Sequence, residues 1–236
     1  MINFLLLSLM FFLSVNTYSQ KNDTIRENIL ITKKEILPIS LITAGSLLNF
    51  GNMKYDFQSY VKKTNIKADD YIQYAPIGIM YISDAIGVKH KNTAFNQTKY
   101  LVISEISAAL TIFLLKKSTN VERPNKHQHS FPSWHTTQAF VGATSLYYEF
   151  KDYNKLTAYS GFVFSTATGI LRITNNKHWI SDVLCGAGIG ILVTNIIYKL
   201  EPLKNWKFFK SKQNLSFYPN YNYFDNNMSL TLRIVL

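Results

Sequence analysis

The stretch FPSWHTTQAF, residues 131–140, places a proline, a serine and a histidine directly before an apolar run with the character of a helix. Ser133 is of a residue type that favours the position before a helix, where a hydroxyl accepts a hydrogen bond from the first backbone N–H groups. These N–H groups also form a natural site for an anion. We therefore predict a helix that begins at residue 134, with Ser133 and His135 at its mouth.

Further stretches on both sides of this helix are rich in Leu, Ile, Ala, Val and aromatic residues and contain few helix breakers. This composition, over lengths of 16 to 20 residues, is typical of helices. The predicted helices are 35–50, 71–88, 99–116, 134–150, 156–173 and 179–198. We expect an all-α fold, a helical bundle of about six helices, within a domain at 30–200.

The two ends of the chain differ from this domain. Residues 1–19 are uncharged, strongly apolar up to Val15 and followed by small residues, which predicts a signal peptide that is cleaved near Ser19. An uncleaved membrane anchor is the alternative. Residues 201–236 begin as a basic linker and continue with alternating apolar residues around Asp225, which predicts a β-hairpin.

Composition narrows the choice of partners. The chain has 236 residues and a net charge of +11, which favours an anionic partner such as a membrane surface, a phosphate compound or a nucleic acid. Its single cysteine, Cys185, excludes an internal disulfide and a cysteine-rich metal site.

Several predicted helices are shorter than the roughly 20 residues that a membrane span requires. Their lengths suit buried helices as well as short spans, and lysines flank both ends of most of them.

Charged and polar residues gather at the ends of four predicted helices. If neighbouring helices run antiparallel, Lys116, Ser133, Arg172 and His178 all lie at one end of the bundle. Arginine is scarce in this lysine-rich chain, and two of its four arginines, Arg123 and Arg172, fall here. Guanidinium groups bind oxyanions through two parallel hydrogen bonds. We therefore expect a phosphate cradle at this end.

His178 and Asp182 are four residues apart and share one face of a helix. A carboxylate in this position accepts a proton from one imidazole nitrogen and fixes the tautomer, so that the other nitrogen is free to act as a nucleophile. A surface ion pair or a pair of metal ligands at the same spacing is the alternative.

Three motifs in this order resemble those of a known family. Lys116 and Arg123-Pro124 fit K-x6-R-P, the stretch 132–135 (PSWH) resembles P-S-G-H, and Arg172, His178 and Asp182 fit R-x5-H-x3-D. Over about residues 95–200 the chain resembles the type 2 phosphatidic acid phosphatase family. The fold of this family is shared with vanadium haloperoxidases and bacterial class A acid phosphatases.

The resemblance implies hydrolysis of phosphomonoesters in two steps, without a metal or any other cofactor. His178 would attack phosphorus and form a phosphohistidine, and Asp182 would orient it. His135 would protonate the leaving alcohol and then activate water. The remaining site residues would hold the phosphoryl oxygens: Lys116, Arg123, Ser133, Trp134 and Arg172.

Two positions depart from the family pattern. Trp134 stands where the family has glycine, and Leu171 replaces a serine, so one hydroxyl donor to the phosphate is missing. Trp134 can still donate its backbone N–H, and its indole would cover the pocket or meet a lipid chain. His127 and His129 form a short H-x-H motif, which we assign to a loop near the substrate entrance rather than to a metal site.

The sequence therefore predicts an exported phosphatase for phosphomonoesters or pyrophosphates, with lipid phosphates favoured, a membrane surface as partner and no nucleic acid. The predicted location is periplasmic or membrane-associated, with the site facing outward. The alternatives are a vanadate-dependent haloperoxidase, with vanadate bound at His178, and a non-catalytic protein of the same fold that binds phosphate or lipid.

Overall fold

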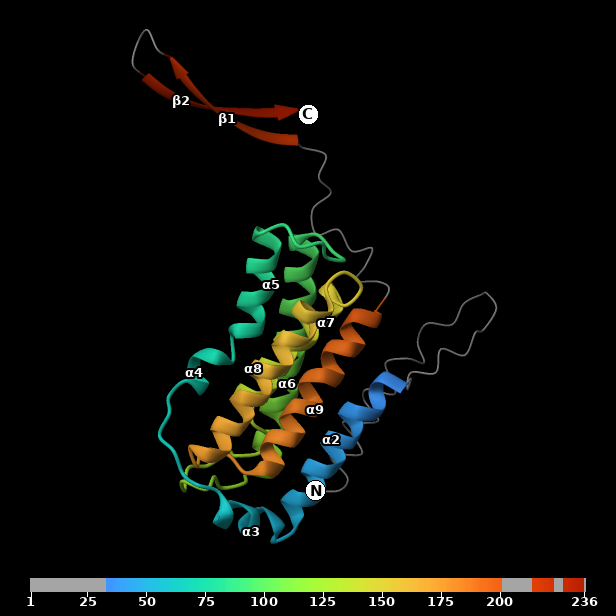
Figure 1. Cartoon of the computed structure of the whole chain (residues 1–236), viewed down its shortest axis with the longest axis vertical. Coiled ribbons are helices and arrows are strands. Elements are labelled where there is room, and N and C mark those ends of the chain that lie inside the picture. Colours follow the sequence, from blue (N-terminus) through green and yellow to red (C-terminus); the bar gives the residue numbers. More distant parts are fainter. Residues whose placement is uncertain (1–32, 201–213, 223–226, 236) are drawn as a thin grey trace, which may run out of the picture. The chain divides into compact units, whose positions relative to one another are not determined.

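The computed structural model describes residues 33–200, 214–222 and 227–235 (Figure 1). Residues 33–200 form the helices α2 (Lys33–Phe50), α3 (Met53–Tyr60), α4 (Asp69–Ile72), α5 (Ala75–Ala85), α6 (Ala94–Thr119), α7 (Trp134–Phe150), α8 (Lys155–Thr174) and α9 (Ile180–Lys199). The all-α bundle that the sequence predicts is confirmed. The predicted signal peptide at 1–19 and the basic linker at 201–213 lie outside the described residues.

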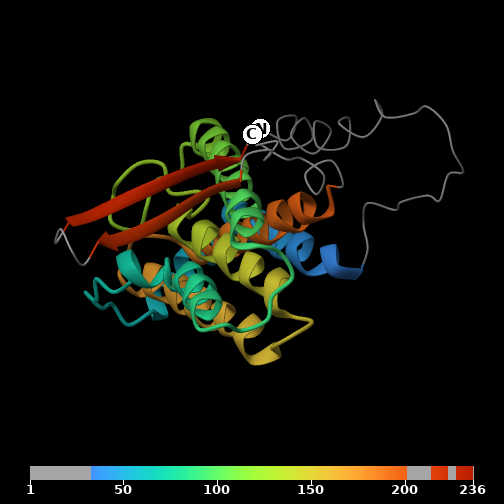
Figure 2. The ribbon, with the colours of Figure 1, turned by 90° about the horizontal axis from the view of Figure 1, so that it is seen from above.

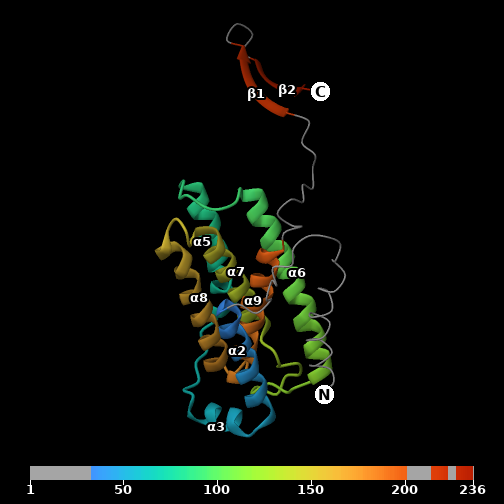
Figure 3. The same cartoon turned by 90° about the vertical axis from the view of Figure 1, so that its right-hand side faces the viewer.

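The individual helices differ from the predicted ones in two places. The predicted helix at 71–88 is divided into α4 and α5, and Pro76 stands in the first turn of α5. Because a proline has no backbone N–H to donate to a preceding helical turn, it starts a new helix here. The chain also forms α3 where we predicted a link. The α2 and α3 axes are bent by 94°, so that α3 lies across one end of the bundle (Figure 3).

Helix α7 is the centre of the bundle, and it packs against α5, α6, α8 and α9. Viewed from above, it lies among the other helices (Figure 2). The start of α7 approaches α9 closely because Gly186 has no side chain: a Cβ there would lie 2.7 Å from the Ser133 carbonyl oxygen. The Ser133 N–H donates to the Asp182 carbonyl at 3.0 Å. The two helix starts are thereby fixed beside each other.

The antiparallel arrangement brings the predicted helix ends together. Helices α6 and α8 end, and α7 and α9 begin, at the end of the bundle where α3 lies (Figures 1 and 3). The site residues on these four helix ends therefore share one end of the fold, as the sequence predicts. Helix α2 reaches the same end with its C-terminus (Figure 1).

Two described helices, α6 and α9, are long and apolar enough to cross a membrane, and the bent pair α2 and α3 makes a third if it is one span. Helix α6 exposes a row of large apolar side chains along its length, namely Val102, Ile106, Leu110, Phe113 and Leu114. In contrast, most of α9 is buried inside the bundle. The α6 face therefore has the apolar surface that lipid requires.

The C-terminal segment forms a separate unit. Strands β1 (Asn214–Asn222) and β2 (Asn227–Val235) pair antiparallel, with Leu215 opposite Ile234. The predicted hairpin is therefore present, although part of its predicted turn, Asp225 and Asn226, lies outside the described residues.

Candidate active site

His178 and Asp182 form a buried pair at the start of α9. The His178 Nδ1 lies 3.1 Å from the Asp182 Oδ2, and the two side chains are 1% and 0% exposed. An ionised Asp182 accepts the proton on Nδ1, which leaves the His178 Nε2 unprotonated. The arrangement predicted from the i,i+4 spacing is therefore present in the structure.

Burial keeps His178 neutral. Removal from water lowers the pKa of this imidazole to about 4, against the opposing effect of Asp182, and the positive charges of Arg172 and Lys116 lower it further. A histidine with this pKa is unprotonated at neutral pH and carries a lone pair on Nε2. The side chain is thus in the state that a nucleophile requires.

Other donors hold the Asp182 carboxylate in place. The Trp179 N–H donates to Oδ2 at 2.9 Å, and the Ser130 hydroxyl makes a short hydrogen bond to the same oxygen. Ser130 Oγ also lies 3.5 Å from His178 Nδ1. Because each of these donors is buried, Asp182 has little freedom to turn away from His178.

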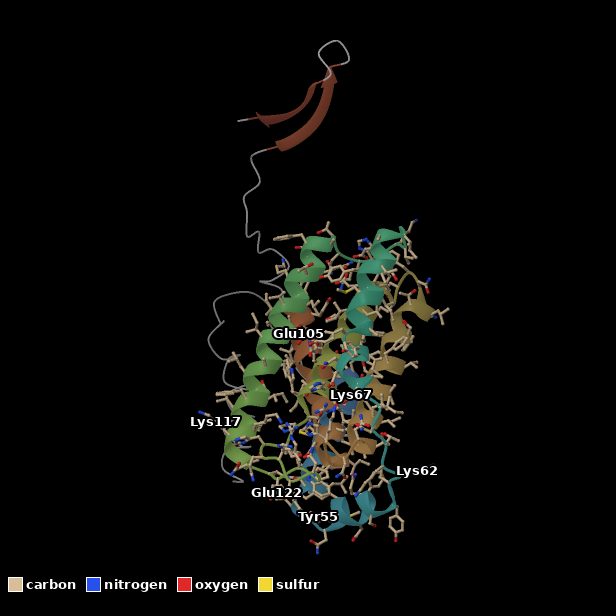
Figure 4. The ribbon with its side chains drawn as sticks, turned by 90° about the vertical axis from the view of Figure 1, so that its left-hand side faces the viewer. Tyr55, Lys62, Lys67, Glu105, Lys117 and Glu122 are labelled. Atoms are coloured by element: carbon tan, nitrogen blue, oxygen red, sulfur yellow. The ribbon has the colours of Figure 1, made fainter. Side chains whose placement is uncertain are left out.

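The loop between α6 and α7 covers this pair and is fastened at two points. Lys116 Nζ donates to the carbonyl oxygens of His129 and Ser130 at 2.6 and 3.1 Å, and Trp179 Nε1 donates to the Glu122 carbonyl at 2.7 Å. Lys116 therefore holds the loop with two of its three donors, and one donor remains for an anion. Figure 4 shows Lys117 and Glu122 toward the end of the bundle where Tyr55 of α3 lies, whereas Glu105 lies higher on α6.

Ser133 occupies the predicted position before α7, but its hydroxyl does not cap the helix. Ser133 Oγ instead accepts a hydrogen bond from Thr136 Oγ1 at 3.0 Å. The predicted side-chain cap is therefore wrong. The first N–H groups of a helix have no partner within the helix, so those of Trp134 and His135 are placed to meet an anion. Trp134 is half-buried.

Two guanidinium groups converge on the same place. Arg123 and Arg172 line a common cavity, and within the described part of the chain the buried Nε atoms of both have no hydrogen-bond partner. Burial lowers the pKa of Arg123, and the neighbouring charge of Arg172 lowers it further. Buried donors without a partner are costly, and an oxyanion between these two groups would satisfy both.

Arg172 has a partner that the sequence did not indicate. Its Nη1 lies 2.9 Å from Asp69 Oδ2, and Lys177 Nζ lies 3.0 Å from the same oxygen. Asp69 Oδ1 accepts from Asn175 Nδ2 at 3.0 Å. Asp69 is completely buried. Burial alone would raise the pKa of Asp69, but hydrogen bonds from Lys177 and Arg172 outweigh it and hold this pKa below its usual value.

His135 lies next to this clamp, because the Asp70 Oδ1 that it contacts also lies 3.6 Å from Arg172 Nη1 and from Lys177 Nζ. His135 Nε2 lies 3.2 Å from Asp70 Oδ1. Burial lowers the pKa of His135 to about 4, and the positive charge of Arg172 acts in the same direction, while Asp70 and Asp69 oppose both. A phosphate dianion bound beside His135 would raise this pKa, because a nearby negative charge favours the imidazolium.

A cavity of about 420 Å³ opens beside the guanidinium groups and is lined by Arg123, Asn125, His127, Gln128, Arg172 and Lys177. Each of these side chains is polar, which suits an anionic headgroup. His127 lines the cavity, in agreement with its predicted place near the entrance. In the described residues, no group of three or more His, Cys, Asp or Glu is placed to hold a metal ion.

Sequence reasoning missed part of this arrangement. Asp69 and Asp70 lie in a polar link about a hundred residues before Arg172, and no motif connects them. Lys177 lies inside the spacer between Arg172 and His178, and Ser130 lies in a loop without a recognisable pattern. The one signal in the sequence is that these two acidic residues are adjacent in an otherwise basic segment.

Comparison with known proteins agrees with the geometry. Residues 97–206 match the family model of the PAP2 superfamily. The lipid A 1-phosphatase of Porphyromonas gingivalis is 32% identical to the chain over 179 residues, which make up 73% of this chain and 39% of that protein. The chain thus spans less than half of the length of this relative.

Two solved structures are also similar to the chain. The crystal structure of Aquifex aeolicus LpxE has a TM-score of 0.46 and 22% identity, and the match covers 56% of this chain and 84% of that one. The crystal structure of a transmembrane PAP2 type phosphatidylglycerolphosphate phosphatase from Bacillus subtilis has the same TM-score and 19% identity, with 73% and 99% of the two chains covered.

Proposed function

We propose that the protein is a phosphatase acting on phosphomonoesters or pyrophosphates, with lipid phosphates favoured, since residues 97–206 match the family model of the PAP2 superfamily. The observation that carries the proposal is the pair of guanidinium groups of Arg123 and Arg172, whose buried Nε donors have no partner among the described residues. They share a cavity with Lys177, and Arg172 and Lys116 act electrostatically on His178. This is the charge pattern that a transferring phosphoryl group requires.

In the proposed reaction, His178 Nε2 attacks phosphorus while its Nδ1–H stays bonded to Asp182. His135 gives a proton to the leaving oxygen, and the enzyme holds a phosphohistidine. His135 then takes a proton from water, whose oxygen attacks phosphorus and releases phosphate. Lys116, Arg123, Arg172, Ser133 and the backbone N–H of Trp134 stabilise the phosphoryl oxygens. The reaction uses no metal ion, because cationic side chains already provide the charge that a metal would supply.

A lipid substrate is favoured by two surfaces. The cavity at the site is lined by polar side chains that suit a headgroup, and the neighbouring α6 exposes an apolar face that suits acyl chains. The relative from Porphyromonas gingivalis is a lipid A 1-phosphatase, which is in line with a phosphorylated lipid as the substrate class. We further propose that the site faces outward from the cytoplasm, at the membrane surface.

Phosphate release by the purified protein tests the proposal. The panel contains lipid phosphates, polyprenyl pyrophosphates and soluble phosphomonoesters, each assayed beside the variant Arg123→Gln, which removes one unpartnered guanidinium. The proposal is supported if phosphate is released fastest from a lipid phosphate and if the Arg123→Gln variant releases it at least about tenfold more slowly. Failure to release phosphate from any substrate favours the vanadate-dependent haloperoxidase or the non-catalytic binding protein.

A further inference from the structure

The short helix α4 presents two adjacent carboxylates to the site, and they have different partners. Asp69 is fully buried and holds Arg172 and Lys177. Asp70 is 45% exposed, and its Oδ1 lies 3.2 Å from His135 Nε2. The same oxygen lies 3.6 Å from Arg172 Nη1 and 3.6 Å from Lys177 Nζ. The shortest of the three contacts of Asp70 is therefore the one to the histidine.

This contact determines which imidazole nitrogen is available for chemistry. With Nε2 directed at Asp70, the remaining nitrogen of His135 is Nδ1, and it is the one that can exchange a proton with a substrate oxygen. In the pair of His178 and Asp182 the opposite nitrogen is engaged, since the carboxylate holds Nδ1 and leaves Nε2 for the reaction. A carboxylate on one imidazole nitrogen fixes both the tautomer and the ring orientation.

The charges around His135 make this carboxylate important for holding a proton. Four charged groups act on the imidazole: Asp69 and Asp70 from α4, Arg172 from α8, and Lys177 from the turn that leads to α9. Burial and the two cations oppose protonation, and the two carboxylates favour it. Asp69 is already bonded to both cations, so Asp70 is the carboxylate that contacts the imidazole itself.

We infer that Asp70 is a positioning residue for the general acid His135: it orients the imidazole through Nε2 and favours its protonated form. The inference rests on the proposed function. When the bond between phosphorus and His178 Nε2 forms, the bond to the leaving oxygen breaks, and the proton on His135 Nδ1 passes to that oxygen. His135 then accepts a proton from the attacking water, whose oxygen bonds to phosphorus as the bond between phosphorus and His178 Nε2 breaks.

A different role would follow if the Asp70 carboxylate occupied the place of a phosphoryl oxygen and blocked the cradle. Its contacts to Arg172 and Lys177 are longer than that to His135, and its partial exposure places it at the edge of the buried cradle. These observations favour positioning. The two roles also predict opposite effects, since removal of a blocking carboxylate would raise kcat/KM.

The test compares Asp70→Asn with the wild type on two substrates. For an alkyl phosphate lipid, whose leaving group needs a proton, kcat is expected to fall about 10- to 100-fold, and for p-nitrophenyl phosphate, whose leaving group does not, by less than about threefold. The limb of the pH–kcat profile at high pH, where His135 loses its proton, moves to lower pH, because the imidazolium has lost its carboxylate partner. Asp70→Glu should restore part of the lost rate.

Asp56→Asn is the matched control, since Asp56 is an exposed carboxylate on the neighbouring α3, and it should change none of these quantities. Equal kcat for wild type and Asp70→Asn on the alkyl phosphate, or a higher kcat/KM, would overturn the inference. Titration of the His135 imidazole by NMR is independent of turnover: its pKa should fall in Asp70→Asn and stay unchanged in Asp56→Asn. An inactive wild type would refute the proposed function, whereas an active wild type with an unchanged Asp70→Asn variant refutes this inference alone.

Discussion

Replacement of Asp69 by alanine tests how the cradle is held together. Asp69 is the buried partner of both Arg172 and Lys177, at 2.9 and 3.0 Å, and the exposures of the Asp69 and Arg172 side chains are 0% and 4%. Asp69→Ala leaves the buried Arg172 guanidinium with only the more distant carboxylate of Asp70, whose Oδ1 lies 3.6 Å from Nη1. Removal of one partner from a buried ion pair costs about 3–5 kcal/mol of the free energy of unfolding.

A loss of this size is measurable as a change in Tm. For a domain of this length each kcal/mol corresponds to about 2–4 °C, so Tm should fall by about 6–20 °C. Thermal unfolding in detergent micelles, followed by circular dichroism, measures it, with Asp56→Ala as the exposed-carboxylate control. Inorganic phosphate should raise Tm more in Asp69→Ala than in the wild type, because the anion replaces the missing negative charge beside Arg172.

The pH dependence of Tm provides a second check, because the direction in which the Tm difference changes with pH can be predicted. The pKa of Asp69 is held below its usual value in the folded protein, so its contribution to stability is present above the pKa of the unfolded chain, about 3.9, and is lost as pH falls through the folded pKa. The Tm difference between wild type and Asp69→Ala should therefore shrink in acid. A Tm of the variant within about 2 °C of the wild type at neutral pH would refute the reasoning, since this is less than 1 kcal/mol.

Three further predictions follow from the site and the fold. His135→Ala should lower kcat/KM, which reports formation of the intermediate, by about 10²- to 10⁴-fold for alkyl phosphates and much less for p-nitrophenyl phosphate, and equal losses in kcat/KM would contradict its role as general acid. Activity should persist in EDTA, and vanadate should inhibit by resembling the pentacoordinate transition state; activity that a chelator removes and a divalent ion restores would contradict metal independence. In a Cys185→Ser background, Lys126→Cys near the site should react with an impermeant maleimide in intact spheroplasts. If α2 and α6 both cross the membrane, Lys34→Cys, at the opposite end of α2, should react only after lysis. The reverse pattern of labelling would place the site in the cytoplasm.

The sequence was sufficient for the parts of the site that lie at fixed distances along helices. His178 and Asp182 meet because residues four apart share a helix face, and Lys116, His135 and Arg172 converge because antiparallel neighbours bring alternate helix ends together. These relations depend on local geometry and on a simple packing rule. They hold in the structure although α6 (Ala94–Thr119) is longer at both ends than the predicted helix 99–116.

The contributions of α4 could not be predicted in this way. Asp69 and Asp70 reach the site through a tertiary contact between distant segments, and the choice of Arg172 as the partner of Asp69 depends on how α4 packs against α8. The break between α4 and α5 was readable from Pro76, but our prediction treated 71–88 as one helix. The missing cap at Ser133 has a local origin instead, because the Thr136 hydroxyl, three residues along the chain, donates to the Ser133 hydroxyl.

The central claim is that His178 carries the phosphoryl group between the two halves of the reaction. The direct measurement is mass spectrometry of the His135→Ala variant, quenched in base during turnover of p-nitrophenyl phosphate. This variant can still form the intermediate from a good leaving group, but it has lost the group that activates water, so the intermediate should accumulate. The account predicts a phosphorylated His178 and an unmodified protein when His178→Ala is added. Phosphate on another residue, or turnover that persists in His178→Ala, would contradict it.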